Sequence, residues 1–445
     1  MFLAYFTEQP MSAYPEEAAL SSHPFDHPAR EAGDSVLLFS NRFFDPEAGA
    51  RLYAERMEEY REVERVGFDG IMVNEHHNGP FCMQPRANIT SAMLTGLTER
   101  VKIVQLGNPL PTWDNPVQLA EETAMIDMMS GGRLVAGIVR GGGNEQFANN
   151  ANPAFNRERF EEGHDLLVKA WTEPGPFRWE GNHFQVPVVN PWAVPVQKPH
   201  PRIWVPGVTS IETIAFAARH RYPYVCLNTS EADTLRIWKT YGDAAEEAGY
   251  QAGEDLRGYL MRIHVQDDEE RAIANAVEFE WMQGEFTGMS KPWLISPAGY
   301  SSAESRLARM KLIAERDRLA GKDPNERPAE RSLADAEQQK KKLLEIELER
   351  KAIIAGTPKQ AIERIRRWLE LTRPSILFLW GNDGKIPHED AMRCIQLIGE
   401  EVIPAVREIG DELGIHSPFD IDSPVSLAAE RGVPTPDASE WALTS

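Results

Sequence analysis

Basic residues are in deficit in this sequence. The 445 residues include 47 lysines and arginines against 68 aspartates and glutamates, which gives a formal net charge of −21. Such a charge repels phosphate backbones and anionic lipid surfaces alike, so nucleic acid is not an expected partner. No stretch approaches the roughly 18 uncharged apolar residues that a membrane span needs, and the N-terminus lacks a basic start. We therefore expect no membrane association and a cytoplasmic location.

Cysteine is also scarce. Cys82, Cys226 and Cys394 are odd in number, widely spaced and free of any C-x-x-C pairing. This pattern supports neither a disulfide framework nor a zinc site, and it fits a reducing compartment.

What the sequence does contain is a regular alternation of β-rich runs and amphipathic stretches. Eight such runs are expected to be strands: Phe2–Phe6, Gly70–Asn74, Val101–Leu106, Leu134–Val139, Ile203–Val205, Tyr224–Leu227, Leu260–Val265 and Ile376–Trp380. Seven helical patterns lie between or after them: Ala48–Val66, Pro116–Met129, Arg157–Trp171, Ser210–His220, Glu231–Ala248, Pro358–Leu371 and Glu389–Ile409. Eight alternations predict an α/β protein with a single (β/α)8 TIM barrel.

Three segments exceed what a minimal barrel uses. They follow strand 1 (9–45), separate strands 4 and 5 (172–201, with a hairpin near 177–184) and follow strand 7 (about 281–355). The last contains interleaved charges and leucines near its end, which favour a solvated helix. We expect residues 1–410 to form the barrel with these insertions and residues 411–445 to form a C-terminal extension.

The sharpest local motif follows the second strand. Glu75, His76 and His77 stand where a barrel strand would deliver side chains to the active-site end. Adjacent residues on an extended segment point in opposite directions, so the two imidazoles are poorly placed to ligate one metal. The motif is a candidate catalytic site, and a structural histidine pair is the alternative.

A second motif is the glycine-rich run 131–143 around the fourth strand. Arg140 lies at the end of that strand and could pair with a phosphate or carboxylate through a bidentate fork. Arg157 and Arg159 open the next helix, and one of them could reach the same anion. The alternative for Arg140 is a flexible turn with a solvated arginine, and the alternative for Arg157 and Arg159 is surface ion pairing with Glu161 or Glu162.

A third motif follows the fifth strand. Thr209 and Glu212 have the spacing of a capping box, while Ser210 and Thr213 offer hydroxyls beside free N-terminal amides of a helix. Such an end favours anions, although a well-capped helix alone would look the same.

Taken together and in this order, the motifs resemble the bacterial luciferase-like flavin monooxygenases, from Met1 to about Arg407. The resemblance rests on residues 67–69 leading to the motif 75–77, on Asn115–Glu122, and on Ile126–Arg133 continuing to Arg140-Gly141. It also rests on Ser210–Thr213 before Ala217-Ala218 and on Gly356-Thr357-Pro358. The family is one of TIM barrels.

The resemblance implies reduced FMN at the C-terminal mouth of the barrel. Its phosphate would be held by Arg140, Arg157, Ser210 and Thr213. His76 matches the family's active-site histidine and His77 its neighbour. Leu106 and Gly107 match the position where members often carry a non-proline cis peptide behind the flavin ring.

The resemblance also implies a reaction. Reduced FMN would arrive from a separate flavin reductase and, with dioxygen, oxygenate a small organic substrate. The chain is expected to form a dimer or tetramer. His76 would stabilise or protonate the oxygenated species, a task suited to an imidazole titrating near neutrality. Thr209 and Val139 stand where luciferase has an acidic residue and a cysteine, so light emission is not implied.

Two alternative functions remain open from the residues. One is deazaflavin-dependent hydride transfer on the same barrel. The other is a metal-dependent hydrolase using Glu75, His76, His77 and His264, although their spacing lacks an H-x-H or H-x-x-x-H pair. The substrate is not readable, but four aromatic residues are candidates for its pocket wall: Phe81, Trp113, Trp192 and Trp293.

Overall fold

A computed structural model describes residues 1–21, 36–286, 292–300, 332–420 and 426–436, together with the single residues 303, 307 and 311. Parts of the predicted insertions at 9–45 and 281–355 and of the C-terminal extension lie outside these residues. The side chain of Trp293 lies outside them as well.

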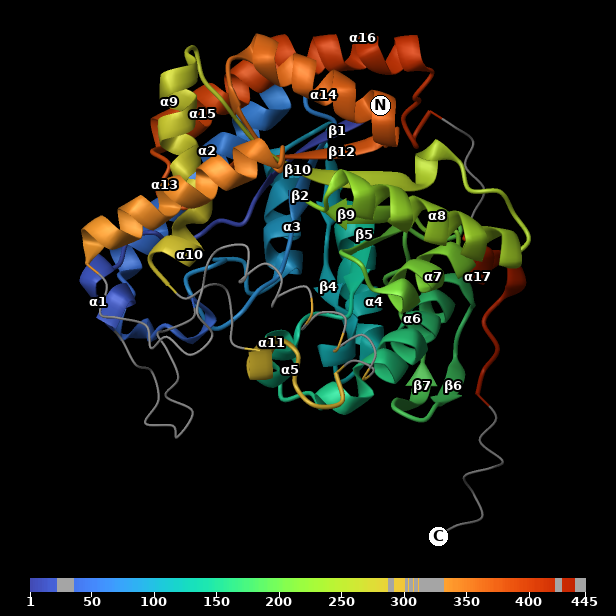
Figure 1. Ribbon diagram of the computed structural model, residues 1–445. Coiled ribbons are helices and arrows are strands. Elements are labelled where there is room, and N and C mark those ends of the chain that lie inside the picture. The colour runs from blue at the N-terminus through green and yellow to red at the C-terminus, as the bar shows by residue number, and fades with distance from the viewer. Residues whose placement is uncertain are drawn as a thin grey trace.

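Eight parallel strands close into a barrel (Figure 1). They are β1 (Phe2–Thr7), β2 (Gly70–Val73), β3 (Lys102–Gln105), β5 (Leu134–Val139), β8 (Arg202–Gly207), β9 (Tyr224–Leu227), β10 (Arg257–Val265) and β12 (Ile376–Asn382). Each strand pairs with the next in this order, and β12 pairs back with β1. The predicted barrel and all eight predicted strands are confirmed.

Large side chains fill the barrel interior. Phe2, Trp204 and Phe378 are fully buried there, with the ring centroids of Phe2 and Trp204 5.5 Å apart. Their neighbours along the strands, such as Leu3 and Tyr5, belong instead to the cluster under the helices. This alternation follows from the two-residue period of a strand, and it makes the barrel a packed core rather than a channel.

The helices surround the barrel. The predicted ones form as α2 (Pro46–Arg65), α4 (Pro116–Met129), α6 (Asn156–Thr172), α7 (Ile211–Arg219), α8 (Glu231–Glu247), α14 (Pro358–Thr372), α15 (His388–Leu397) and, after a π-helical turn, α16 (Ile403–Leu413). Asp45 shows why α2 starts where it does, because its carboxylate accepts from the amides of Glu47 and Ala48 while Pro46 takes the first helical position.

One barrel helix, α3 (Ala87–Leu97), was not predicted from the sequence. Its inward face is polar, and Gln105 of β3 satisfies that face by donating to Asn88 Oδ1 at 2.8 Å and to Ser91 Oγ at 3.1 Å. A helix that buries hydrogen-bonded polar groups does not produce the apolar stripe on which sequence reading depends.

Two strands extend the barrel. The short β4 (Asn108–Pro109) pairs with the end of β5, and β11 (Ile353–Gly356) pairs with Arg262–Val265 of β10, beyond the point where β10 leaves β9. The predicted hairpin is present as β6 (Phe177–Glu180) and β7 (Gln185–Val189), with its second strand starting later than expected.

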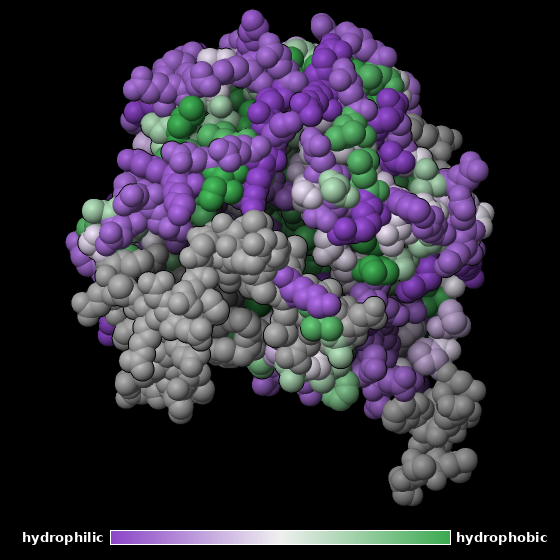
Figure 2. Space-filling model, viewed as in Figure 1, coloured by the Kyte–Doolittle hydropathy of each residue, from purple (hydrophilic) through white to green (hydrophobic). Residues whose placement is uncertain are grey.

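The insertion after strand 7 contributes α10 (Trp281–Gly284), α11 (Pro292–Ile295) and α13 (Leu333–Glu349), and it is preceded by α9 (Glu269–Ala276). The helix expected from its interleaved charges is α13, and the upper part of the surface in Figure 2 is mainly hydrophilic. The part of the prediction that covers 312–331 lies outside the described residues. Within the described chain, no helix is both long and apolar enough to cross a membrane.

The first and last insertions pack against each other. Val36, Leu37 and Phe39 share an apolar cluster with Trp281, Phe286 and Leu294, to which Phe81 also belongs. Two segments far apart in the sequence therefore form one body beside the barrel mouth. All three cysteines are buried free thiols.

Candidate active site

The functional candidates gather at one end of the barrel because parallel strands all deliver their carboxyl ends there. Six strands contribute: Glu8 follows β1, His76 follows β2, Gly107 follows β3, Arg140 follows β5, Ser210 follows β8 and Asp383 follows β12.

His76 is bound to a buried carboxylate. Its Nδ1 lies 2.9 Å from Oε1 of Glu145, on the short helix α5 (Gly143–Ala148), and its Nε2 lies 3.9 Å from Glu8. Burial alone would lower the pKa of His76, but the hydrogen bond and charge of Glu145, together with the charge of Glu8, outweigh it and raise the pKa to about 9. The imidazole is thus a cation at neutral pH, which corrects the expectation that it titrates near neutrality.

Glu145 is well suited to hold that cation. Its side chain is only 3% exposed, and it also accepts from the Gly142 amide at 2.6 Å and from the Asn144 side chain. Burial acts to raise its pKa, yet the contacts with His76 leave that pKa lowered. The pair therefore stays charge-separated and fixed in orientation, with Nδ1 engaged.

A second acidic group lies near His76. The carboxylate of Glu8 accepts a hydrogen bond from the side-chain amide of Asn74, and burial raises the pKa of Glu8. Burial and the nearby charge of Glu8 also raise the pKa of Asp383 to about 8, although Trp281 Nε1 and the Gly384 amide donate to its Oδ1. The mouth thus contains one carboxyl group, that of Asp383, whose pKa lies above neutrality.

His77 faces another way, as the extended backbone predicted. Its Nε2 lies 3.1 Å from Glu75, and Glu75 in turn accepts from Arg86 and from the Ala87 amide at the start of α3. The amide of Asn149 lies 3.4 Å from the same Nε2. These contacts connect the loop after β2 to α3 and α5, and the His77 ring does not point into the barrel mouth.

The segment after β3 carries the backbone feature that the resemblance indicated. The Leu106–Gly107 peptide is cis. A Cβ on Gly107 would stand 2.8 Å from the carbonyl oxygen of Gly137, and a Cβ on Gly137 would stand 1.5 Å from that of Gln105. Glycine at both positions lets β3 and β5 approach closely under this peptide.

Arg140 is held at the edge of the mouth by the last insertion. Its Nη1 donates to Asn156 Oδ1 at 2.9 Å and to the Tyr300 carbonyl at 3.5 Å, and its guanidinium lies 5.0 Å from the centroid of the Tyr300 ring. The Tyr300 hydroxyl donates to the Gly141 carbonyl. Tyr300 therefore binds the insertion to both Arg140 and the glycine loop.

Arg157 lies near Arg140 and is short of partners. Its Nη1 is buried without a hydrogen-bond acceptor among the described residues, and the nearest carboxylate oxygen, on Glu161, lies 3.7 Å away. Burial and then the charge of Arg140 lower the pKa of Arg157. Two neighbouring guanidinium groups, one with a buried Nη1 that has no hydrogen-bond acceptor among the described residues, fit a bound dianion such as a phosphate group.

The start of α7 completes this anion site. The helix is capped by Ser210, and no described side chain closes a capping hydrogen bond, so the predicted capping box of Thr209 and Glu212 is wrong. Ser210 Oγ instead donates to Glu212 at 3.0 Å and accepts from Thr213 Oγ1 at 3.0 Å. Both arginines act electrostatically on Glu212, which brings the four predicted phosphate ligands into one neighbourhood.

Arg159 plays a different part. It donates to the carbonyls of Pro111 and Trp113 at 2.8 and 2.9 Å, so it braces the loop after β3 and does not reach the anion site.

The aromatic residues predicted to line a substrate pocket differ in where they lie. Phe81 packs on His76, with ring centroids 4.9 Å apart. Trp113 is half-buried against the helical layer. Trp192 is 91% exposed, so the prediction that it lines a pocket is wrong.

The residues of the metal-hydrolase alternative do not assemble. His264 shares hydrogen bonds with the Gly381 carbonyl, Gln266 and Asn275, and burial lowers its pKa to about 4. Across the described residues, no group of three or more His, Cys, Asp or Glu side chains is arranged to hold a metal ion.

Sequence reasoning missed Glu8, Glu145 and Asp383. Glu8 and Asp383 do follow strand ends, which is a signal available in the sequence. Glu145 lies in a loop helix between strands, and only the fold brings it to His76.

The chain forms a (β/α)8 barrel whose mouth combines an imidazole held by Glu145 with a candidate anion site after the fourth and fifth strands. The chain belongs to the luciferase-like monooxygenase family, whose model matches residues 35–373.

A relative agrees with this membership, and solved structures share the fold. The oxygenase component of the flavin-dependent trigonelline monooxygenase of Acinetobacter baylyi is 29% identical over 250 residues, covering 55% of this chain and 68% of that protein. The oxygenating constituent of 3,6-diketocamphane monooxygenase from Pseudomonas putida, in complex with FMN, superposes with a TM-score of 0.57 at 18% identity, covering 80% of this chain and 93% of that one.

An F420-dependent secondary alcohol dehydrogenase superposes almost as well, with a TM-score of 0.55 at 18% identity over 80% of this chain and 95% of that one. At such identities the two structures establish a shared fold alone.

Proposed function

We propose that this chain is the oxygenase component of a two-component monooxygenase, which takes reduced FMN from a separate reductase and oxygenates a small organic substrate with dioxygen. The observation that carries the proposal is the anion site of Arg140, Arg157, Ser210 and Thr213. The buried Nη1 of Arg157 has an ion pair with Glu161 at 3.7 Å but no hydrogen-bond acceptor among the described residues, which matches the need of a flavin phosphate for charge-assisted hydrogen bonds.

In this proposal the chain's residues divide the work. Arg157 and the hydroxyls of α7 would bind the phosphate, and the backbone of Leu106 and Gly107 would contact the flavin ring. Reduced flavin, when bound, supplies the electrons with which dioxygen is activated.

His76 holds a proton for the reaction. Because Nδ1 is engaged by Glu145, the proton available to the mouth is the one on Nε2. A pKa of about 9 keeps that proton in place at neutral pH until a substrate-derived oxygen or a change of local charge draws it away. His77 acts as a positioning residue that fixes the loop through Glu75.

Water exclusion falls to the two packed insertions. The apolar cluster of Val36, Leu37, Trp281, Phe286 and Leu294 lies beside His76 through Phe81. A dry mouth keeps activated oxygen from being lost to solvent, and these segments are where the substrate would be selected.

Two features support the proposed partners. The relative from Acinetobacter is by its name an oxygenase component, which implies a separate reductase for that protein. Exposed apolar side chains on α3 and α4, namely Ile89, Met125 and Met129, support a homo-oligomer.

The test compares reduced FMN with reduced riboflavin, which lacks the phosphate. The parent protein is expected to bind FMN more tightly, and Arg157→Ala should weaken FMN binding about tenfold or more while leaving riboflavin unchanged. Arg236→Ala is the control, because Arg236 lies on the surface of α8 in an exposed pair with Asp233. Equal binding of the two flavins by the parent protein would contradict the phosphate assignment.

The rival on the same fold is hydride transfer from reduced F420. Anaerobic titration of both reduced cofactors, followed by mixing with oxygen, separates the two. Tighter binding of F420 and no acceleration of oxygen uptake over free reduced FMN would favour the dehydrogenase.

A further inference from the structure

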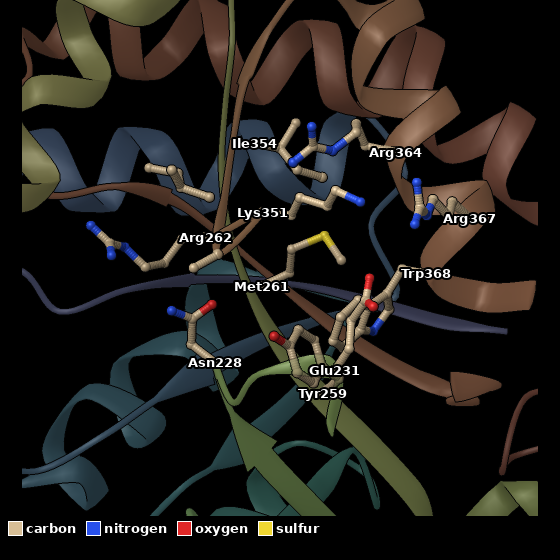
Figure 3. Close-up of a pocket in the computed structure, with 12 residues that line it drawn as sticks. Asn228, Glu231, Tyr259, Met261, Arg262, Lys351, Ile354, Arg364, Arg367 and Trp368 are labelled. Atoms are coloured by element: carbon tan, nitrogen blue, oxygen red, sulfur yellow. The ribbon is translucent and has the colours of Figure 1, made fainter. Parts of the chain in front are cut away.

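We propose a second anion site, outside the barrel and separate from the mouth, that binds a phosphate group. It is the pocket between β10, β11, α14 and the start of α8, drawn in Figure 3. The pocket opens where the sheet partner of β10 changes: pairing with β9 ends at Leu260 and pairing with β11 starts at Arg262. Its unfilled space, including the open mouth, is about 390 Å³.

The charge of this pocket is opposite to that of the protein. Its lining includes Lys351, Arg364, Arg367 and Arg262 against a single carboxylate, Glu231. Arg262 is neutralised by Glu280, donates to the Phe279 carbonyl at 3.1 Å, and points away from the other three in Figure 3. Three cations therefore share one carboxylate in a chain whose net charge is −21.

No hydrogen bond or ion pair joins the side chains of Lys351, Arg364 or Arg367 to a described residue. Lys351 and Arg367 are exposed, whereas Arg364 is half-buried and its Nη2 is fully buried. Burial lowers the pKa of Arg364, and the charge of Arg367, one turn away on α14, lowers it further, whereas Glu231 acts in the opposite direction. Like charges at this spacing repel, and a bound anion would relieve the repulsion.

Two buried donors in the pocket also lack acceptors. They are Nη2 of Arg364 and Nε1 of Trp368, and neither has a hydrogen-bond partner in the described part of the chain. Trp368 itself is only 8% exposed. Buried donors are nearly always satisfied in native proteins, so these two, in the same pocket as three cations, point to an acceptor-rich ligand.

The chemistry of the lining identifies the ligand class. Guanidinium, ammonium and indole N–H groups only donate, so the ligand must supply several acceptor oxygens and negative charge, as a phosphate group does. Tyr259, Met261 and Ile354 form an apolar floor beside the cations. The ligand is therefore inorganic phosphate or a small phosphomonoester whose organic part rests on this floor.

The test is calorimetric titration with inorganic phosphate and with phenyl phosphate at constant ionic strength. It uses the full chain carrying Arg157→Ala, so that the flavin-phosphate site does not contribute. Arg364→Gln and Arg367→Gln are each expected to weaken binding about tenfold or more, and Arg364→Lys to retain most of it. Arg366→Gln is the matched control on the same helix, because Arg366 faces away and pairs with Glu412 at 2.7 Å.

The outcomes are distinct. Tighter binding of phenyl phosphate than of phosphate assigns the site to a phosphomonoester, and equal binding assigns it to inorganic phosphate. Glu231→Gln should tighten either one. Absence of saturable binding up to about 10 mM, a limit that corresponds to less than 3 kcal/mol of binding free energy, or equal losses in Arg366→Gln and Arg364→Gln, would overturn the proposal. Unchanged FMN binding in Arg364→Gln, measured with Arg157 intact, keeps this result separate from the proposed function.

Discussion

Nδ1 of His76 and Oε1 of Glu145 lie 2.9 Å apart although the two residues belong to loops after different barrel strands. The contact fixes which ring nitrogen faces the mouth and keeps the imidazole cationic. It also converts a histidine that would titrate near 6.5 into one with a pKa of about 9.

Replacing Glu145 by glutamine should undo this shift. In Glu145→Gln the amide still reaches Nδ1 but carries no charge, so the pKa of His76 is expected to fall from about 9 toward the ordinary value of about 6.5. NMR titration of the His76 ring would follow it, and the alkaline limb of any turnover profile should move to lower pH. Glu58→Gln, beside His388 on the outer surface, is the control and should leave His76 unchanged. An unshifted His76 in Glu145→Gln would mean that another group holds its proton.

The same pair predicts how stability depends on pH. The folded-state pKa of His76 is raised, so its contribution is full below the unfolded value of about 6.5 and is lost as pH rises through about 9. Urea unfolding of the parent protein at pH 6.5 and 9.5 should show this loss, and His76→Gln should reduce it. If the free energy of unfolding fell by the same amount between these two pH values in both proteins, the pair would be ruled out as a source of the pH dependence.

Asp383 should destabilise the folded protein progressively as pH rises from 3.8 to about 8. Its pKa is about 8 when folded, against 3.8 for the ordinary side chain. As pH rises between these values, the unfolded state loses the proton that the folded state keeps, and the free energy of unfolding falls. Asp383→Asn keeps an acceptor for Trp281 and should remove this fall, gaining about 1 kcal/mol or more at pH 8. Asp267→Asn, in an exposed pair with Arg393, should not.

Tyr300 is expected to couple the last insertion to the mouth. Tyr300→Phe removes the hydroxyl bond to Gly141 and keeps the ring over Arg140. A lost hydrogen bond of about 1 kcal/mol loosens the segment about fivefold, so the share of consumed oxygen released as hydrogen peroxide should rise. Peroxide and oxygen electrodes measure that share, and an unchanged value would separate Tyr300 from water exclusion.

Two glycines offer a matched test of the backbone under the cis peptide. Gly137→Ala would place a methyl group 1.5 Å from the Gln105 carbonyl, whereas Gly96→Ala on α3 meets no atom within 4 Å. The first should cost about 3 kcal/mol or more, and the second should stabilise by about 0.5–1 kcal/mol because alanine is the better helix former. Urea unfolding of both variants gives the comparison.

The sequence predicts the barrel well because its strands are short, buried and separated by amphipathic helices. Helix α3 escapes prediction for the opposite reason, since Asn88 and Ser91 turn hydrogen-bonded polar groups inward toward Gln105. A pattern of apolar residues cannot reveal a buried interface that is polar.

Some residues of the candidate site could likewise be predicted from the sequence, and others could not. His76 and Arg140 directly follow strands, so their place at the mouth can be read from the sequence. Glu145 reaches His76 only because the glycine loop turns back over the mouth, and its effect on the proton of His76 depends on a distance that no local pattern encodes. The exposure of Trp192 was likewise unreadable, because an aromatic residue after a hairpin fits a wall or a surface equally well.

Because the first and last insertions share one apolar cluster, we expect them to determine substrate choice together. A substitution at Leu37 changes the surface that Trp281 and Phe286 must fit, and the reverse also holds. Grafting either insertion alone from a relative with another substrate would leave mismatched halves, whereas exchanging both would carry the whole shape across. Diversification of this barrel toward new substrates is therefore expected to proceed by paired changes at two distant places in the chain.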